Sequence, residues 1–220
     1  MKLIIYGNGR IARIVYQYVK KQFEVVSFTV QNDLVTETTM EGLPMRPFEN
    51  IELELDPADH AMLIAVGYLD MNEIRRKKYE EAKNKGYVLA NYVHPSVHWH
   101  DDVNIGEGNI IFDQVSIQPG VRLGNNNFIW SGSVIAHGCT IEDDCWVTSG
   151  VAIAGDTTIK SGGFLGVNCT IGNDLTMGER TFVGANALVT KSTGQNEVYI
   201  ASGSEQIRLD SHRFLKFAEV

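Results

Sequence analysis

The sequence has few of the residues that mark several common protein classes. Among its 220 residues there are only 3 cysteines and 5 prolines, and no two cysteines have the CxxC spacing. This scarcity argues against a disulfide framework, a zinc ribbon and a proline-rich disordered tract. Three cysteines without a disulfide framework favour a reducing compartment, so we expect a cytoplasmic protein.

Positive charge and long apolar runs are also scarce. Lys and Arg number 19 against 27 Asp and Glu, and the net charge of −8 argues against nucleic acid as a partner. The apolar runs are far shorter than a membrane span, and the first residues lead directly into a glycine motif, as a strand does and a signal peptide does not. Residues 1–92 carry 13 acidic and 12 basic side chains and residues 93–220 carry 14 and 7, so the N-terminal part meets an anionic ligand more easily.

Glycine is the abundant residue, and its first use is in a loop near the N-terminus. The 21 glycines include Gly7 and Gly9, which follow a predicted strand over residues 3–6 and precede an apolar-periodic helix. Further predicted elements are strands at 25–30, 61–66 and 88–92 and a helix at about 72–85. This order is typical of a Rossmann-like α/β domain with one mononucleotide-binding half, so we expect residues 1–92 to bind a nucleotide joined to something other than a second nucleotide.

The candidate ligand-binding residues of this part lie where predicted strands end. Glycines let the backbone approach a phosphate, and a helix N-terminus offers free N–H groups. The substrate-binding candidates are Gly7, Asn8, Gly9, Arg10, Asn32, Asp33, Gly67, Tyr68 and Asn72, with Arg75 as a candidate for phosphate pairing. The structural alternative is a tight turn and a helix start with solvated charges.

From residue 93 onward an apolar residue recurs at every sixth position. Seventeen positions keep this register without a shift: Val93, Trp99, Ile105, Ile111, Ile117, Leu123, Ile129, Ile135, Ile141, Val147, Ile153, Ile159, Leu165, Ile171, Met177, Val183 and Val189. A six-residue period is typical of a parallel β-helix, in which three hexads make one coil and the recurring side chain points inward. The sixteen hexads of residues 93–188 predict about five coils.

A second register, four residues after the first, holds mostly small or β-branched residues. Cys139, Cys145 and Cys169 all lie on it. Because the core has room only for a small side chain beside each aliphatic one, we expect these cysteines to be buried and unreactive.

The hexads resemble those of the left-handed β-helix acyltransferases, which are trimers that use acyl-CoA. With the Rossmann-like domain ahead of them, the chain more narrowly resembles the bacterial nucleotide-sugar acetyltransferases, which N-acetylate an amino-deoxysugar. The resemblance implies a Rossmann-like domain over 1–92, a left-handed parallel β-helix over 93–191 and a short C-terminal cap over 192–220, in which Phe214, Leu215 and Phe217 suggest a helix. It also implies acetyl-CoA as co-substrate, a nucleotide-linked amino sugar as acceptor and a homotrimer.

The segment 128–139 looks like the catalytic stretch of that family and places His137 at the general base. Imidazole titrates in the range needed to take a proton from an attacking amine, and a backbone N–H can stabilise the oxyanion. By family position Gly155 is that donor. The orienting acid that relatives often place near the histidine is not evident, since Ala136 and Gly138 flank it, and Asp113, Glu142 and Asp143 are the candidates.

The resemblance also implies a cofactor groove between subunits. The family positions that would contact acetyl-CoA are Gly166, Val167, Ala185, Thr190 and Lys191. Gly166 and Ala185 are small enough for a pantetheine arm to pass, and Lys191 is placed to pair with a phosphate. Two departures from the family are Trp146, where one branch has a polar contact, and the absence of a closing Gly-x-Pro-Ala motif.

Two alternatives stay open at this point, and a third is disfavoured. The first is O-acetylation of a sugar of the sialic-acid type, which the residues do not separate from N-acetylation. The second is a non-catalytic trimeric scaffold, which would have no need of His137 and Gly155. The third, a zinc site at His94, His98 and His100, is disfavoured because ligands for a trimer cleft must come from different coils, so we expect no metal.

Overall fold

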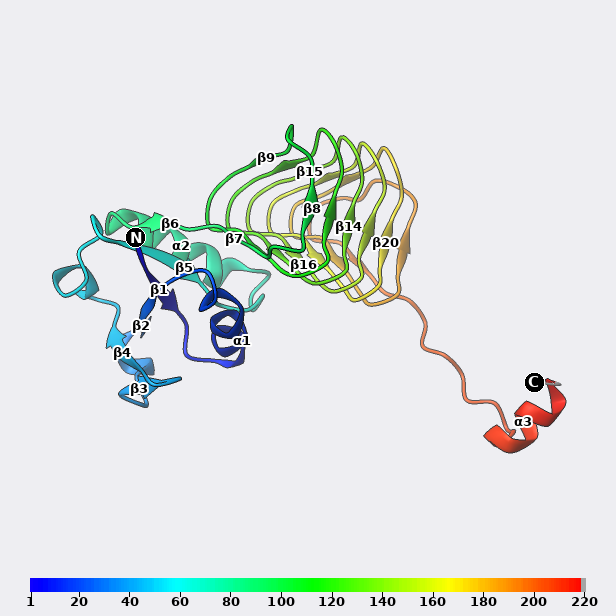
Figure 1. The fold of residues 1–220 in the computed structure, drawn as a ribbon. Coiled ribbons are helices and arrows are strands. Elements are labelled where there is room, and N and C mark those ends of the chain that lie inside the picture. The colour runs from blue at the N-terminus through cyan, green and yellow to red at the C-terminus, as the bar shows by residue number, and fades with distance from the viewer. Residues whose placement is uncertain (219–220) are drawn as a thin grey trace.

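The computed structural model describes residues 1–218, which form a small α/β part, a long three-sided coil and an extended C-terminal arm (Figure 1). The first part is built on β1 (Lys2–Tyr6), which is apolar on both faces and lies in the middle of its sheet. The parallel strands run in the order β4 (Leu43–Pro47), β2 (Val25–Val30), β1, β5 (His60–Ile64) and β6 (Val88–Leu89), and β3 (Thr39–Met40) is antiparallel to β4.

Helices cover both faces of this sheet. The buried side of α1 (Arg10–Val19) packs with Leu3 and Ile5, whereas α2 (Glu73–Asn84) packs with the side chains of Ile4 and Tyr6. Two 3₁₀ turns, η1 (Asn32–Leu34) and η2 (Ile51–Leu53), complete the part. The strands and helices predicted at 3–6, 25–30, 61–66 and 72–85 are confirmed. Of the strand predicted at 88–92, only Val88–Leu89 joins this sheet, because the chain passes into the prism at Tyr92. The strands β3 and β4 were not predicted, because two prolines in the sequence of β4 speak against a strand.

The chain then winds into a prism with three parallel sheets, called here the first, second and third faces (Figure 1). The first face consists of β7 (Tyr92–Val93), β10 (Ile110–Ile111), β13 (Phe128–Ile129), β16 (Trp146–Val147), β19 (Phe164–Leu165), β22 (Phe182–Val183) and β24 (Val198–Tyr199). The second face consists of β8 (His98–Trp99), β11 (Ser116–Ile117), β14 (Val134–Ile135), β17 (Ala152–Ile153), β20 (Thr170–Ile171) and β23 (Leu188–Val189). The third face consists of β9 (Asn104–Ile105), β12 (Arg122–Leu123), β15 (Thr140–Ile141), β18 (Thr158–Ile159) and β21 (Thr176–Met177).

Nearly every strand of the prism pairs in parallel with the strand 18 residues further on, as Ile117 does with Ile135. Three hexads therefore close one coil, and the repeated parallel pattern fits the predicted left-handed β-helix. The last coil extends past the expected boundary at residue 191, because β24 pairs in parallel with β22.

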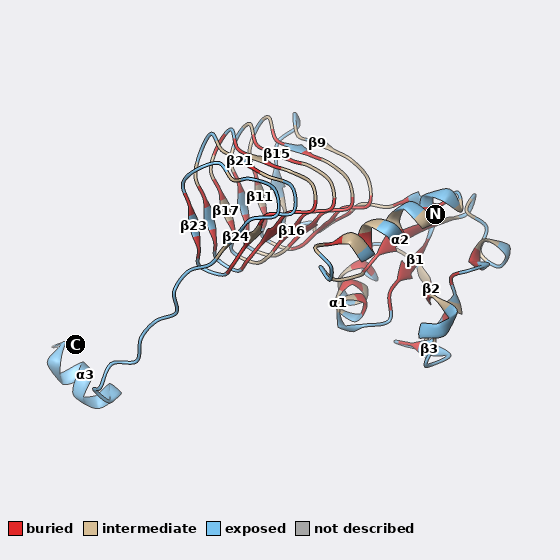
Figure 2. Cartoon of the chain, turned by 180° about the vertical axis from the view of Figure 1, so that it is seen from behind, coloured by how far each residue is buried: buried red, intermediate tan, exposed pale blue. Residues whose placement is uncertain are grey.

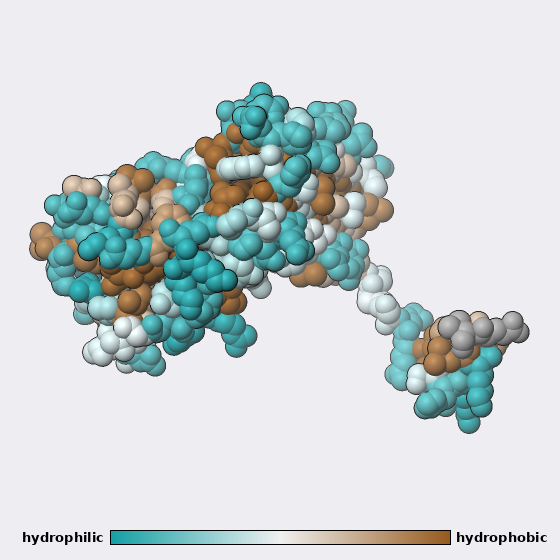
Figure 3. Space-filling view, in the orientation of Figure 1, coloured by the Kyte–Doolittle hydropathy of each residue, from teal (hydrophilic) through white to brown (hydrophobic). Residues whose placement is uncertain are grey.

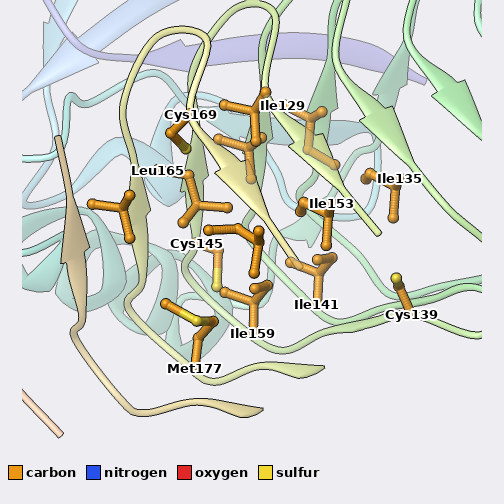
Figure 4. Packing of buried hydrophobic residues seen from close by; sticks show 14 of the residues in the cluster. Ile129, Ile135, Cys139, Ile141, Cys145, Ile153, Ile159, Leu165, Cys169 and Met177 are labelled. Atoms are coloured by element: carbon orange, nitrogen blue, oxygen red, sulfur yellow. The ribbon is translucent and has the colours of Figure 1, made fainter. Parts of the chain in front are cut away.

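The predicted inward register is confirmed for the body of the prism. The aliphatic positions from Ile111 to Val189 form one buried cluster along the axis (Figure 4). Trp99, in the first coil, is 42% exposed and is the exception. The three cysteines are unpaired and fully buried, and burial raises the pKa of Cys145 and Cys169 to about 12, so the thiols are protonated and inaccessible.

A further period of six, not predicted from the sequence, lies at the corners of the prism. One residue in each hexad from residue 105 to 188 has a left-handed backbone: Gly108, Gln114, Gly120, Asn126, Gly132, Gly138, Asp144, Gly150, Asp156, Gly162, Asn168, Asp174, Arg180 and Asn186. Gly, Asn and Asp tolerate this conformation best and hold all but two of these positions. The glycine excess of the chain is thus partly a requirement of the corners.

The N-terminal part is docked on the first face through an apolar surface. Side chains that point outward from this face, among them Phe128, Trp146 and Phe164, are buried in one cluster with the core of the α/β part. Figure 2 shows the α/β part beside the prism, with buried segments in red in both. The rings stack along the prism, with Phe128 and Trp146 4.5 Å apart and 16° from parallel. At one edge of the interface the Tyr18 hydroxyl donates to Asp113 at 2.8 Å.

At the other edge of the interface lies Arg75 of α2, which is completely buried. Its guanidinium donates to the backbone carbonyls of Asn126 and Asp144 and to the side chain of Asn72, and it lies 5.3 Å from the ring of Phe128. Burial lowers the pKa of Arg75 to about 10 and raises the pKa of Asp144 to about 6. Both groups therefore stay mainly charged at neutral pH, and Arg75 joins the two parts of the chain.

The C-terminal arm does not form the expected cap. The helix α3 (Ser211–Phe217) exists, but it stands clear of the last coil (Figures 1 and 3). Its side chains Phe214, Leu215 and Phe217 are exposed. The segment between Ile200 and Asp210 is exposed throughout. Over residues 1–218 no helix combines the length and the apolar character that crossing a membrane requires.

Arg75→Met should loosen the docking of the N-terminal part. The substitution keeps the length of the side chain but leaves buried carbonyls without their donor, which we expect to destabilise the interface by about 3–5 kcal/mol. Thermal unfolding followed by circular dichroism should show an earlier transition. The control is Arg76→Ala, because Arg76 pairs with Glu73 and Glu80 on the surface of the same helix and should change stability by at most about 1 kcal/mol. Equal effects of the two variants would contradict the role of Arg75.

Candidate active site

His137 lies at the corner between the second and third faces, directly after β14. Its side chain is 63% exposed, and its backbone N–H donates to the Gln118 side chain at 3.0 Å. The N-terminal part covers the first face, which is opposite this corner in a three-sided prism. The candidate base is thus turned away from the α/β part of its own chain.

Gly155 lies one coil beyond His137, on the same corner. The imidazole rests against its backbone so closely that a Cβ atom at this position would lie 2.7 Å from Nε2 and 2.9 Å from Nδ1. The backbone conformation of Gly155 is ordinary and would allow a side chain. The imidazole ring of His137 excludes one, because it occupies the space of a Cβ atom. The structure brings the predicted base and the predicted oxyanion donor together.

None of the three acidic residues considered as the partner of His137 lies beside it. Asp113 accepts hydrogen bonds from Tyr18 and Ser131, whereas Glu142 binds Lys160 and Asp143 binds Asn125. These expectations were wrong because each carboxylate is held at another corner or on another coil. The neighbour of the ring is Asp156, whose Oδ2 lies 3.8 Å from Nδ1 of His137. Its signal in the sequence is a spacing of one coil plus one residue, which was not considered.

The expected acetyl-CoA contacts divide between two corners. Thr190 and Lys191 are exposed and follow β23, so Lys191 lies three coils along the same corner as His137, which is about 14 Å at the usual spacing between strands. Val167 and Ala185 are exposed at the corner between the first and second faces. A single prism does not bring the two sets together.

Gly166 does not provide the expected room for a pantetheine arm. It is buried, and a Cβ atom there would lie 2.6 Å from the backbone of Gly184 and Ala185 on the next coil. The close stacking of coils accounts for this glycine without any ligand.

Most of the expected substrate-binding residues converge at the carboxyl edge of the N-terminal sheet. Gly7 ends β1 with φ +138, and a Cβ atom there would lie 2.7 Å from the carbonyl of Ala65 after β5. Asn8 donates from its side chain to Leu34 O at 2.9 Å, which joins the ends of β1 and β2. The residues Asn8, Gly9, Arg10, Asn32 and Asp33 are exposed, and Gly67 is partly exposed. Gly9 caps α1, whose first turn carries no side-chain cap and no acidic residue.

The remaining expected contacts behave differently. The ring of Tyr68 packs on the prism, with centroid distances of 4.6 Å to Phe164 and 5.4 Å to Trp146. Because Tyr68 is still 47% exposed, it is accessible to a ligand. Asn72 is 1% exposed and binds Gly162 and Arg75 at the interface. Asn72 and Arg75 are therefore structural residues here, because their polar groups are already used to dock the two parts.

The residues 102–137 match the model of the bacterial transferase hexapeptide (six repeats). No match was found among curated protein sequences. The resemblance predicted from the hexads is thus confirmed for the repeat, and the three-faced prism carries it from the first coil to the last.

The whole architecture recurs in solved structures. The acetyltransferase domain of PglB from Neisseria gonorrhoeae FA1090, in complex with acetyl coenzyme A, is 21% identical with a TM-score of 0.82 and covers 91% of this chain and 96% of its own. PerB from Caulobacter crescentus, in complex with CoA and GDP-perosamine, is 24% identical with a TM-score of 0.81 and covers 91% and 94%. WeeI from Acinetobacter baumannii AYE is 21% identical with a TM-score of 0.62 and covers 91% and 97%. The chain shares the fold of these proteins.

Gly155→Ala should displace the His137 ring while leaving the prism intact. The added methyl group would overlap the imidazole, so the ring must rotate away from the corner. A changed chemical shift of the His137 ring protons, with an unchanged circular dichroism spectrum, would report this. Gly203→Ala is the control, because a Cβ atom at Gly203 meets nothing within 4 Å. An unmoved ring in Gly155→Ala would contradict the described packing.

Proposed function

We propose that the protein is an acetyl-CoA-dependent N-acetyltransferase that acts on the amino group of a nucleotide-linked amino-deoxysugar. The observation that carries the proposal is the seating of His137 on Gly155 at an open corner of the prism. The fold is shared with a PglB domain that binds acetyl coenzyme A and with PerB, which binds CoA and GDP-perosamine. A scaffold would have no need for an imidazole held against a backbone amide.

The nucleotide is assigned to the N-terminal part, which we take as a Rossmann-like domain over residues 1–92. The open loop Asn8–Arg10 and the uncapped start of α1 offer backbone N–H groups to a diphosphate. The exposed ring of Tyr68 offers a stacking surface at the neighbouring strand end, and Asn32 and Asp33 offer polar groups to a sugar or base. This edge of the sheet can bind the nucleotide while the amino sugar extends away from it into solvent.

The acyl donor is assigned to a groove between two copies of the chain, with residues 93–191 as the acyltransferase domain. The expected contacts lie on two corners, Val167 and Ala185 on one and Thr190 and Lys191 on the other. A groove between neighbouring prisms joins one corner of each kind, so the division supports the homotrimer implied by the resemblance. Lys191 would supply a cation to a CoA phosphate.

In this arrangement His137 acts as the general base. The substrate nitrogen attacks the thioester carbonyl carbon and forms the new C–N bond while the imidazole takes the proton of the amine. The N–H of Gly155, which donates no hydrogen bond within residues 1–218, is available to the developing oxyanion. The C–S bond then breaks, and the imidazolium returns its proton to the leaving thiolate. The buried cysteines take no part, so transfer is direct.

The proposal is tested with acetyl-CoA and a panel of UDP-, dTDP- and GDP-linked amino sugars, by release of CoA and by the mass of the acetylated product. Transfer to an amino sugar is expected. Transfer only to hydroxyl acceptors would favour a sugar O-acetyltransferase, and no transfer to either would favour a scaffold.

His137→Asn should lower turnover by about 100-fold or more, because the base is lost while the polar character of the corner is kept. His212→Asn, which changes an exposed histidine on α3, clear of the prism, should leave turnover unchanged. Light scattering must show the same oligomer for all three proteins. Full activity of His137→Asn would remove the histidine from the mechanism.

A further inference from the structure

Asp156 is held beside His137 by the backbone of both residues. It lies on the next coil of the same corner, and its N–H donates to the carbonyl of His137 at 2.9 Å. Its carboxylate then reaches back along the corner, so that Oδ2 lies 3.8 Å from Nδ1. The ring is thus bordered by the backbone of Gly155 on one side and by this carboxylate at its Nδ1 edge.

The residue after the histidine leaves room for this carboxylate. A Cβ atom at Gly138 would overlap Oδ1 of Asp156. The left-handed conformation of Gly138 does not by itself explain a glycine, because Asn126 and Asp144 adopt it at equivalent corners. The carboxylate of the next coil fills the space that a side chain at Gly138 would take, as the Asn168 amide does at Gly150.

The corner position of Asp156 requires a residue that tolerates a left-handed backbone, but it does not require a negative charge. The residue is left-handed, with φ 58, and Asn168 and Asn186 hold the equivalent position of their hexads at another corner, with φ 56 and 57. Its side chain is 67% exposed, and an exposed pair with a histidine adds little to stability. The structural account therefore explains an Asn, Asp or Gly at this position and leaves the negative charge beside the ring unexplained.

We infer that Asp156 is the positioning residue of His137, an inference that rests on the proposed function. Its carboxylate accepts the Nδ1–H of the neutral imidazole, which leaves the lone pair on Nε2 to take the proton of the attacking amine. The separation of 3.8 Å must shorten to about 2.7–3.2 Å for this hydrogen bond, which a small rotation of these two exposed side chains achieves without substrate. The acid that relatives place near the histidine is thus supplied here by the next coil.

Two variants remove the charge and keep the corner. Asp156→Asn and Asp156→Gly place residues that hold other left-handed corners, so both should fold and melt as the parent does. The matched control is Asp174→Asn, because Asp174 has the same corner position one coil further on, with φ 56 and an exposed side chain. We expect kcat to fall about 10–100-fold in both Asp156 variants, with little change in KM, and to stay at the parent value in Asp174→Asn.

Two further measurements separate positioning from a structural effect. In the His137→Asn background, Asp156→Asn should cause no further loss, since the carboxylate acts only through the ring. Two-bond ¹H–¹⁵N spectra of the His137 imidazole should show the Nδ1–H tautomer in the parent and its loss in Asp156→Gly. An unchanged tautomer, or an additive loss in the double variant, would overturn the inference. The spectra need no substrate, so a failure of the proposed function and a failure of the positioning role are distinguishable.

Discussion

The stacking of coils at a fixed distance is the constraint on which the rest of this structure depends. Strands 18 residues apart are joined by backbone hydrogen bonds, so each side chain meets the same position of the next coil at about 4.8 Å. At that distance Gly155 and Asp156 act on His137 although they are 18 and 19 residues away in sequence. The candidate site is therefore formed by residues of successive coils at one corner of the prism. The loop that carries His137 contributes only part of it.

The same stacking governs the surface that receives the N-terminal part. Outward aromatic residues of the first face repeat every 18 residues and form a continuous apolar strip. Burial of this strip favours docking, but it has no direction along the prism. Arg75 supplies direction, because its donors must meet the carbonyls of Asn126 and Asp144 at one corner. With the first face covered in this way, the corner that carries His137 stays exposed.

The fold was largely predictable from the sequence, because the period of six reports the inward side chains directly. The left-handed corners carry an equally regular signal, but Gln114 and Arg180 break its composition. Contacts between coils were harder to predict, since they need both the coil length and the direction of each side chain. This is why Asp156 was not considered as the neighbour of His137, whereas Gly155, which the structure places against the ring, was named from the sequence. Asn72 was assigned to the ligand because the sequence around it gives no sign that it is buried against Gly162 of the prism, 90 residues away.

The glycines of the prism show that one residue type serves different constraints. At Gly166 a side chain is excluded by the backbone of the next coil. At Gly155 a side chain is excluded by the imidazole ring of His137. Composition does not separate these cases, since both glycines lie at corners of the same repeat. The two cases differ in the atoms that a side chain at the glycine would contact. Backbone atoms of the coil indicate a folding requirement, whereas the side chain of an exposed histidine indicates a site, because nothing in the stability of the prism requires that ring to be there.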